Sequence, residues 1–203
     1  MIAITHRKLC RRPFLEQLGR VLEGGPEMVI LREKDLSKDD LAHLAESCLE
    51  LCSKRDVPLS INTASDVAFE LGIDHVHLPL EVARSEDLGR FRVVGVSVHG
   101  SDEATEAESL GADYLIAGHV FPTACKLGLE PRGTDFVGTV CGSVDIPVYA
   151  VGGITPDNVG KVFSAGAAGA CAMSSMMTSE DPASLVRALS ACWEVAHPPS
   201  ILR

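Results

Sequence analysis

The amino-acid sequence predicts an α/β fold, a (β/α)8 TIM barrel that forms a single domain over residues 1–203. Eight short apolar segments alternate with segments in which apolar residues recur at helical spacing, a pattern typical of a parallel sheet wrapped by helices. A weak repeat also recurs three times, in which a helical segment ends at a glycine and an apolar strand follows. An open doubly wound sheet is the alternative, but eight regular units favour closure into a barrel.

The predicted strands cover residues 2–5, 28–31, 59–62, 75–78, 93–97, 114–117, 148–151 and 169–173. Helical patterns cover residues 14–22, 39–54, 64–71, 103–110, 156–165 and 182–196, and weaker ones cover 79–92 and 131–140. Ser37 is the predicted N-cap of the second helix. Thr155 is the predicted N-cap of the helix at 156–165, with Pro156 in its first position.

Composition and charge restrict the partners of the chain. A hydrophobic content of 46% with only 4% aromatic residues indicates aliphatic packing, as in parallel sheets covered by helices. The net charge of −10 argues against a nucleic-acid partner, because binding the phosphate backbone requires a basic face. No apolar run approaches the length of a membrane span, so no membrane partner is expected. A locally positive pocket can still hold an anionic metabolite.

The seven cysteines include no CxxC pair, which argues against a disulfide framework. Cys48 and Cys52 are spaced to share one helix face. With no signal peptide recognised, a reduced cytoplasm is the expected location. Cys125 lies in the loop described next, and its role is left open.

Residues 118–128 form the most informative stretch of the chain. They follow a predicted buried strand and carry His119, Thr123 and Lys126 in a loop bounded by proline and glycine. Histidine exchanges protons near neutral pH, and Lys126 supplies a positive charge. The loop is therefore predicted to belong to a small-molecule active site with His119 as its catalytic residue. The alternative is a histidine that merely caps a solvated loop.

In a closed barrel, residues at the carboxyl ends of the strands meet at one mouth. Arg32 and Lys34, after the second strand, are predicted to bind an anionic group, although such a pair also suits a solvated face. Asn62 and Ser97 are predicted to be uncharged hydrogen-bonding groups on the pocket wall. His77 alternates inward with apolar neighbours and is predicted to be a buried histidine of the barrel core.

The loops after the seventh and eighth strands together predict a phosphate site. Gly152 and Gly153 let backbone N–H groups approach an anion closely, and a helix is expected to begin near Met173, Ser174 and Ser175. Barrels of this kind often bind phosphate at these two loops. The alternative is that the glycines only make a tight turn between strand and helix.

Several motifs now match one superfamily in the expected order: Leu31-Arg32-Glu33-Lys34, Ile61-Asn62, Asp66-Val67-Ala68, Gly95-Val96-Ser97, Gly111-Ala112-Asp113-Tyr114, Phe121-Pro122-Thr123, Val151-Gly152-Gly153-Ile154 and Asn158-Val159. On these motifs the chain resembles the thiamine phosphate synthase and thiazole tautomerase (TenI-like) superfamily, from residue 2 to about residue 196. The resemblance implies a (β/α)8 barrel that binds a thiazole phosphate at the glycine loop and the eighth strand.

Two departures bear on the branch of that superfamily. The synthase branch has an aspartate after the Ile-Asn pair and another after the fourth strand, and both bind magnesium. This chain has Thr63 and Val82 at those positions, so a Mg²⁺ site is poorly supported. The segment from Ala117 to Phe121, with Cys125 and Lys126 behind it, is instead similar to the tautomerase branch, in which the histidine is the acid/base residue.

The resemblance therefore implies a thiazole tautomerase of thiamin biosynthesis, an isomerase that aromatises a thiazole carboxylate phosphate by a proton shift at His119. The backbone of Gly152, Gly153, Met173 and Ser174 would hold the phosphate, and Arg32 or Lys126 the carboxylate; no cofactor and no metal is expected. One alternative is a thiamine phosphate synthase-type transferase. The other is a non-catalytic regulatory protein that binds a phosphate ligand on the same barrel. Whether the chain forms a homo-oligomer is left open.

Overall fold

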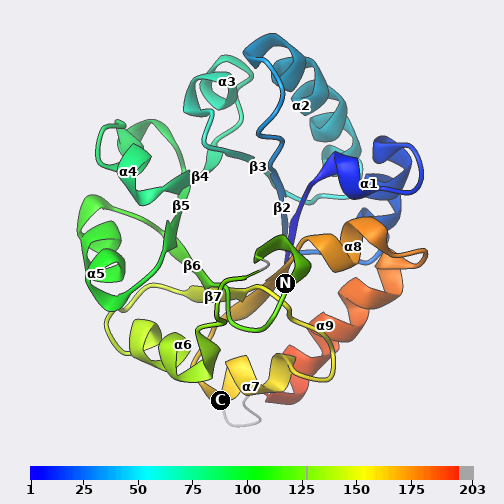
Figure 1. Ribbon diagram of the computed structural model, residues 1–203. Coiled ribbons are helices and arrows are strands. Elements are labelled where there is room, and N and C mark those ends of the chain that lie inside the picture. Colours follow the sequence, from blue (N-terminus) through cyan, green and yellow to red (C-terminus); the bar gives the residue numbers. More distant parts are fainter. Residues whose placement is uncertain (127, 197–203) are drawn as a thin grey trace, which may run out of the picture.

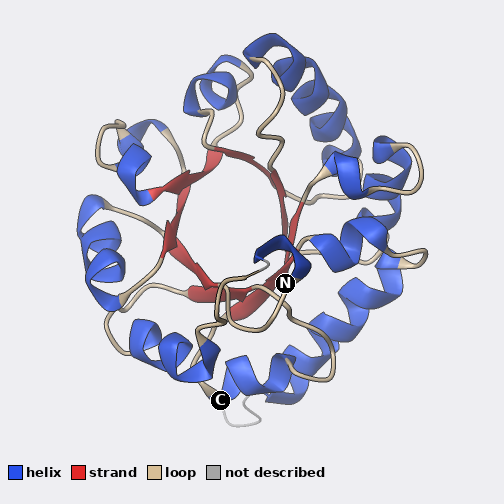
Figure 2. Ribbon diagram, in the orientation of Figure 1, coloured by secondary structure: helices blue, strands red, loops and turns tan. Residues whose placement is uncertain are grey.

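The computed structural model describes residues 1–126 and 128–196, with the backbone alone for residues 194–196. The described strands close into a parallel barrel in the order β1 to β8, and helices surround it (Figures 1 and 2). The strands are β1 (Ile2–Ile4), β2 (Met28–Leu31), β3 (Leu59–Asn62), β4 (His75–Pro79), β5 (Val93–Val98), β6 (Tyr114–Gly118), β7 (Val148–Val151) and β8 (Gly169–Ala172). The barrel prediction is confirmed, and each predicted strand agrees with the observed one to within one residue at either end.

The helices are α1 (Phe14–Leu22), α2 (Lys38–Ser53), α3 (Ser65–Glu70), α4 (Leu80–Ala83), α5 (Ser101–Leu110), α6 (Gly133–Cys141), α7 (Val159–Ser164), α8 (Ser174–Thr178) and α9 (Pro182–Ala196). Short 3-10 turns are η1 (Arg7–Leu9), η2 (Leu88–Arg90) and η3 (Ala124–Lys126). The weak pattern at 79–92 corresponds to α4 and η2, two short elements in place of one helix. The turns η1 and η3 were not predicted, because three residues carry no helical period.

Two helix boundaries test the capping predictions. Ser37 caps α2 as predicted, since its Oγ accepts a hydrogen bond from the backbone N of Asp40 at 3.1 Å. The prediction for the seventh helix is wrong, because α7 begins at Val159 rather than at Pro156. Asn158 Oδ1 accepts from the backbone N of Thr155 at 2.9 Å, and Asn158 Nδ2 donates to the Gly153 carbonyl oxygen at 2.9 Å. These bonds fold residues 155–158 into a turn that fastens the glycine loop.

The barrel separates two apolar cores. Side chains that alternate along the strands fill the barrel interior, among them Ile4, Ile30, Tyr114, Ile116 and Cys171. The intervening side chains point outward and pack with the helices in a larger cluster. This two-sided burial explains why the strands are nearly continuous apolar runs. In the described part of the chain, no helix is long and apolar enough to cross a membrane.

Candidate functional site

A cavity of about 860 Å³ opens at the carboxyl ends of the strands. It brings together all of the residues that the sequence predicted for a site: Arg32, Lys34, Asn62, Ser97, His119, Thr123, Lys126, Gly152, Gly153, Met173, Ser174 and Ser175. Ile4, Ile30 and Ile116 form part of its apolar wall. Small-molecule sites typically have volumes of about 300–1,000 Å³, so the cavity is large enough for two small ligands at once.

Arg32 is held at the mouth by a buried network behind it. The Glu33 side chain is only 1% exposed and points away from the cavity. Its Oε1 accepts from Thr5 Oγ1 at 2.8 Å and from the backbone N of Arg7 at 2.9 Å. Thr5 Oγ1 in turn accepts from the backbone N of Arg32 at 3.0 Å. The network fixes the end of β2, so that the residues on either side of Glu33 line the cavity.

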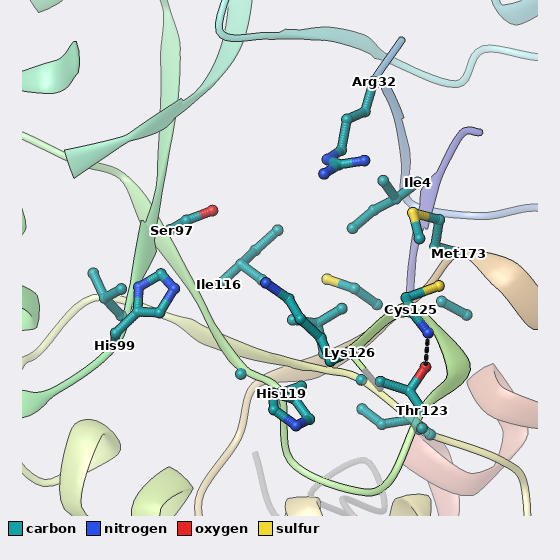
Figure 3. Close-up of a pocket in the computed structure, with 18 of the residues that line it drawn as sticks. Ile4, Arg32, Ser97, His99, Ile116, His119, Thr123, Cys125, Lys126 and Met173 are labelled. Atoms are coloured by element: carbon teal, nitrogen blue, oxygen red, sulfur yellow. Dashed lines mark hydrogen bonds between the residues drawn. The ribbon is translucent and has the colours of Figure 1, made fainter. Parts of the chain in front are cut away.

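Cations line the cavity without an ion pair in the described part of the chain, although Glu81, Glu103 and Glu130 line the same cavity. Figure 3 shows the guanidinium of Arg32 and the ammonium of Lys126 pointing into the same space, with the Ser97 hydroxyl opposite. Lys34 also lines the cavity. Among the described residues, the side chains of Arg32, Lys34 and Lys126 make no ion pair. Unpaired positive charge in one cavity of an acidic protein indicates an anionic ligand.

His119 lines the cavity. Its Nε2 is 3.4 Å from the carbonyl oxygen of Leu129, which is a long contact. In Figure 3 its ring lies below Lys126 and away from Arg32 and Ser97. The same loop places Thr123 Oγ1 at 3.4 Å from the backbone N of Cys125. Leu127, which belongs to this motif, lies outside the described residues.

The glycine loop after β7 packs directly beneath the loop after β6. Gly152 and Gly153 have φ of 103° and 65°, in the left-handed region that favours glycine. A Cβ on Gly153 would lie 2.4 Å from the carbonyl oxygen of Pro122, and one on Gly152 would lie 2.4 Å from the Cβ of His119. Glycine is therefore required here by packing. Because the packing of the two loops already explains both glycines, the glycines by themselves do not indicate a phosphate site. Phosphate binding at this loop stays a prediction.

Sequence reasoning missed seven polar side chains that line the cavity: Glu81, Arg84, His99, Glu103, Glu130, Arg132 and Thr155. His99 directly follows β5, so the rule that singled out His119 after β6 applies to it as well. Arg132 donates to the His99 carbonyl oxygen and lies over the ring of Phe136, 4.8 Å from its centroid. Arg84 forms a bidentate ion pair with Glu106. No sequence motif marks Arg84 or Arg132, because each reaches the cavity through the tertiary fold.

The residues at the two positions that bind magnesium in the synthase branch do not fit that ion. Thr63 offers only a hydroxyl, which already accepts from Asn62 Nδ2 at 2.7 Å, and Val82 offers no oxygen on its side chain. Mg²⁺ prefers carboxylate oxygens in near-octahedral geometry. Within the described residues, no group of three or more His, Cys, Asp and Glu side chains could hold a metal ion.

Comparison with known proteins identifies relatives along nearly the whole chain. Residues 1–176 match the family model described as thiamine monophosphate synthase. A thiamine-phosphate synthase of Chlorobium luteolum is 37% identical over 87% of this chain and 86% of its own length. One of Syntrophomonas wolfei is 35% identical over 94% of each chain. The solved structure of a thiamine phosphate pyrophosphorylase from Pyrococcus furiosus superposes with a TM-score of 0.84 at 31% identity, covering 97% of this chain and 96% of the other.

These relatives overturn the expectation of a thiazole tautomerase and, with it, of an isomerase. The curated relatives carry the name of a synthase, which is a transferase. The expectation gave too much weight to His119 and to two substituted positions.

Proposed function

Because the chain belongs to the thiamine monophosphate synthase family, we propose that it is a thiamine-phosphate synthase. The reaction joins a thiazole phosphate to a pyrimidine that is supplied as its pyrophosphate ester. The bond between the pyrimidine's methylene carbon and the pyrophosphate oxygen breaks, and the same carbon forms a bond to the thiazole nitrogen. Inorganic pyrophosphate leaves with the electron pair of the broken bond.

The observation that supports this proposal is the group of unpaired cations, Arg32, Lys34 and Lys126, in one cavity. Negative charge builds up on the leaving pyrophosphate as its bond to carbon breaks. Preorganised positive charges and hydrogen-bond donors stabilise such developing charge strongly, because they need no reorganisation during the reaction. The Arg32 guanidinium is suited to bind two phosphate oxygens at once, and the Lys126 ammonium acts as a point charge.

The second substrate requires a second anion site. We place the phosphate of the thiazole at Gly152, Gly153 and the start of α8, which line the same cavity. The backbone N–H groups and the hydroxyls of Ser174 and Ser175 would be its donors. Since α8 has only five residues, the field of the helix contributes little there. The cavity volume of about 860 Å³ accommodates both substrates together.

We further propose that the side chains of this chain carry out the charge neutralisation without magnesium. The donor set at Asn62, Thr63 and Val82 does not fit the ion, whereas the unpaired cations Arg32, Lys34 and Lys126 already line the cavity. The expected rate is therefore the same in magnesium and in an excess of chelator. A rate that falls with chelator and returns with magnesium would contradict this part of the proposal.

The test of the proposed function is synthesis of thiamin phosphate from thiazole phosphate and pyrimidine pyrophosphate by the purified protein. Product is measured by chromatography with fluorescence detection after oxidation. Arg32→Gln should lower kcat/KM by about 10-fold to 100-fold, since it removes a charged hydrogen bond to the leaving group. Arg92→Gln is the matched control, because Arg92 pairs with Asp74 at the opposite end of the barrel. The absence of product, with and without magnesium, would contradict the assignment.

A reduced cytoplasm remains the proposed location. All seven cysteines of the chain lie in the described part and are free thiols. Free thiols persist where glutathione and thioredoxin keep the environment reducing.

A further inference from the structure

A histidine, a glycine and a tyrosine lie side by side on three neighbouring strands inside the barrel. The register pairs His77 of β4 with Gly95 of β5, and Gly95 with Tyr114 of β6. A Cβ on Gly95 would lie 2.0 Å from the Tyr114 ring carbon that bears the hydroxyl. Gly95 is therefore the opening through which the tyrosine ring reaches across β5. The rings of Tyr114 and His77 stack with centroids 5.6 Å apart.

Hydrogen bonds extend this contact to the cavity wall. The Tyr114 hydroxyl lies 3.2 Å from His77 Nδ1, and His77 Nε2 lies 2.8 Å from Ser97 Oγ. His77 and Tyr114 are 3% and 5% exposed, whereas the half-buried Ser97 lines the cavity. The three side chains thus form a continuous chain of hydrogen bonds from the barrel interior to the binding site.

The Tyr114 phenol determines which group donates and which accepts in each of these hydrogen bonds. Burial raises the pKa of Tyr114 well above its usual range, so its hydroxyl keeps the proton. The nearby Ser60 hydroxyl opposes that rise, but Ser60 Oγ makes no hydrogen bond of normal geometry within the described residues. By geometry, His77 Nδ1 is the one hydrogen-bond partner of the Tyr114 hydroxyl in the described part of the chain, so it is the acceptor for the phenol proton, because a buried donor without a partner is costly.

The protonation of His77 then determines what Ser97 presents to the cavity. Burial, with a smaller contribution from the charge of Arg32, lowers the pKa of His77 to about 3, so the ring is neutral near pH 7 and carries one proton. If Nδ1 accepts from Tyr114, that proton is on Nε2 and is donated to Ser97 Oγ. The Ser97 hydroxyl hydrogen is then free for a ligand. In the opposite tautomer, Ser97 would donate to His77 and could only accept from the ligand.

We propose that His77, held in one tautomer by Tyr114, is a positioning residue that orients the Ser97 hydroxyl as a donor to an anionic ligand. Arg32 and Lys126 point into the same space as this hydroxyl, which places the ligand's negative charge there (Figure 3). The identity of the anion as the pyrophosphate of the substrate rests on the proposed function. The direction of the hydrogen bonds depends only on the fold.

The tautomer is measured directly by nitrogen-15 NMR of the imidazole rings in the whole protein. Two-bond correlations from the ring carbon protons distinguish a ring protonated at Nε2 from one protonated at Nδ1. The expected result for His77 is protonation at Nε2. Protonation at Nδ1 would overturn the proposal whether or not the protein turns over substrate.

Binding is measured by calorimetry with inorganic pyrophosphate. Ser97→Ala should weaken binding about 10-fold or more, as expected for the loss of a hydrogen bond to a charged group. His77→Asn, which removes the donor to Ser97, should weaken binding about threefold to tenfold. His77→Gln can again place an amide N–H near Ser97 Oγ and should restore affinity to within about threefold of wild type. Adding His77→Asn to Ser97→Ala should produce no further loss, because both changes act on one interaction.

Tyr114→Phe removes the phenol donor and should weaken pyrophosphate binding about twofold to tenfold, the range of a neutral hydrogen bond. Tyr149→Phe is its matched control, because Tyr149 packs edge-on against Tyr114 but its hydroxyl contacts Glu27 at 3.2 Å. The control should bind pyrophosphate as wild type does. Three results would each overturn the proposal. They are an equal loss of pyrophosphate binding in Tyr114→Phe and Tyr149→Phe, additive losses when His77→Asn is combined with Ser97→Ala, and no binding of pyrophosphate by wild type. The predicted pattern of binding in a protein that makes no thiamin phosphate would refute the proposed function alone.

Discussion

Glu33 is the buried acidic group whose removal should affect both stability and the position of Arg32. Its carboxylate accepts three hydrogen bonds, from Thr5 Oγ1, the backbone N of Arg7 and Arg7 Nη1, at 2.8, 2.9 and 3.1 Å. Glu33→Ala leaves the first two donors without this acceptor in a region that is closed to solvent. The Arg7 guanidinium keeps its two bonds to Asp35, at 2.6 and 2.7 Å, so its charge stays paired.

The magnitude follows from that difference. Removing one partner of a fully buried ion pair costs about 3–5 kcal/mol when the other charge is left uncompensated. Because Arg7 is compensated by Asp35, the loss should lie lower, at about 2–3 kcal/mol, the range of hydrogen bonds to a charged group. In a chain of this size, 1 kcal/mol corresponds to about 2–4 °C in Tm, so Glu33→Ala should melt roughly 5–10 °C below wild type.

The assay is thermal unfolding followed by circular dichroism, supported by urea titration at 25 °C. Asp35→Ala removes the exposed partner of the same arginine and should lower Tm by less than Glu33→Ala does. Glu33→Ala should also weaken pyrophosphate binding, because the Thr5 hydroxyl that fixes the backbone of Arg32 loses its own acceptor. A Tm within about 2 °C of wild type, or a larger fall for Asp35→Ala, would refute this reasoning.

Three further predictions follow from the cavity and the barrel interior. Because burial lowers the pKa of His77 to about 3, His77 binds a proton below about pH 6.5 in the unfolded chain but stays neutral in the folded chain. His77 therefore causes a loss of stability as pH falls from about 6.5, by up to about 1.4 kcal/mol per pH unit, and urea titrations at pH 7 and pH 5 should show a smaller loss in His77→Gln; equal losses would contradict the shift. Lys126→Ala should weaken pyrophosphate binding about tenfold at low salt and less at high salt, and calorimetry showing no salt dependence would place the anion elsewhere. Gly95→Ala should lower the free energy of unfolding by about 1–3 kcal/mol through its clash with Tyr114, and Tyr114→Ala in the same chain should recover part of that loss in a urea titration; an undiminished loss in the double variant would refute the clash.

The order of elements and the bounds of the strands could be predicted from the sequence, because both depend on local chemistry. A short apolar run buried on both faces predicts a strand of a parallel sheet without reference to any distant residue. A glycine at the end of a helix predicts a left-handed C-cap, and Gly111 adopts φ of 98° as expected. The error at α7 has the same origin. Pro156 locally predicts a helix start, but the hydrogen bond from Asn158 to the Gly153 carbonyl oxygen holds the preceding residues in a turn, so the helix begins later.

The residues of the cavity could also be predicted, because closure of a barrel brings every strand's carboxyl end to one mouth. Their chemical roles could not be predicted in this way. The segment around His119 suggested an isomerase, whereas the relatives are named as synthases. Two substituted positions and one histidine are a local pattern, whereas the relatives match along nearly the whole chain.

The sequence alone thus determined the barrel, its strands and those mouth residues that directly follow a strand, since apolar period, turn chemistry and chain order are encoded locally. Only the tertiary structure decided which side chains meet. The register across β4, β5 and β6 joins His77 to Tyr114 through the space that Gly95 leaves open, and the fold turns Glu33 inward to hold Arg32 in place. Such contacts depend on which residues of separate strands lie side by side, and only the closed barrel brings those strands together.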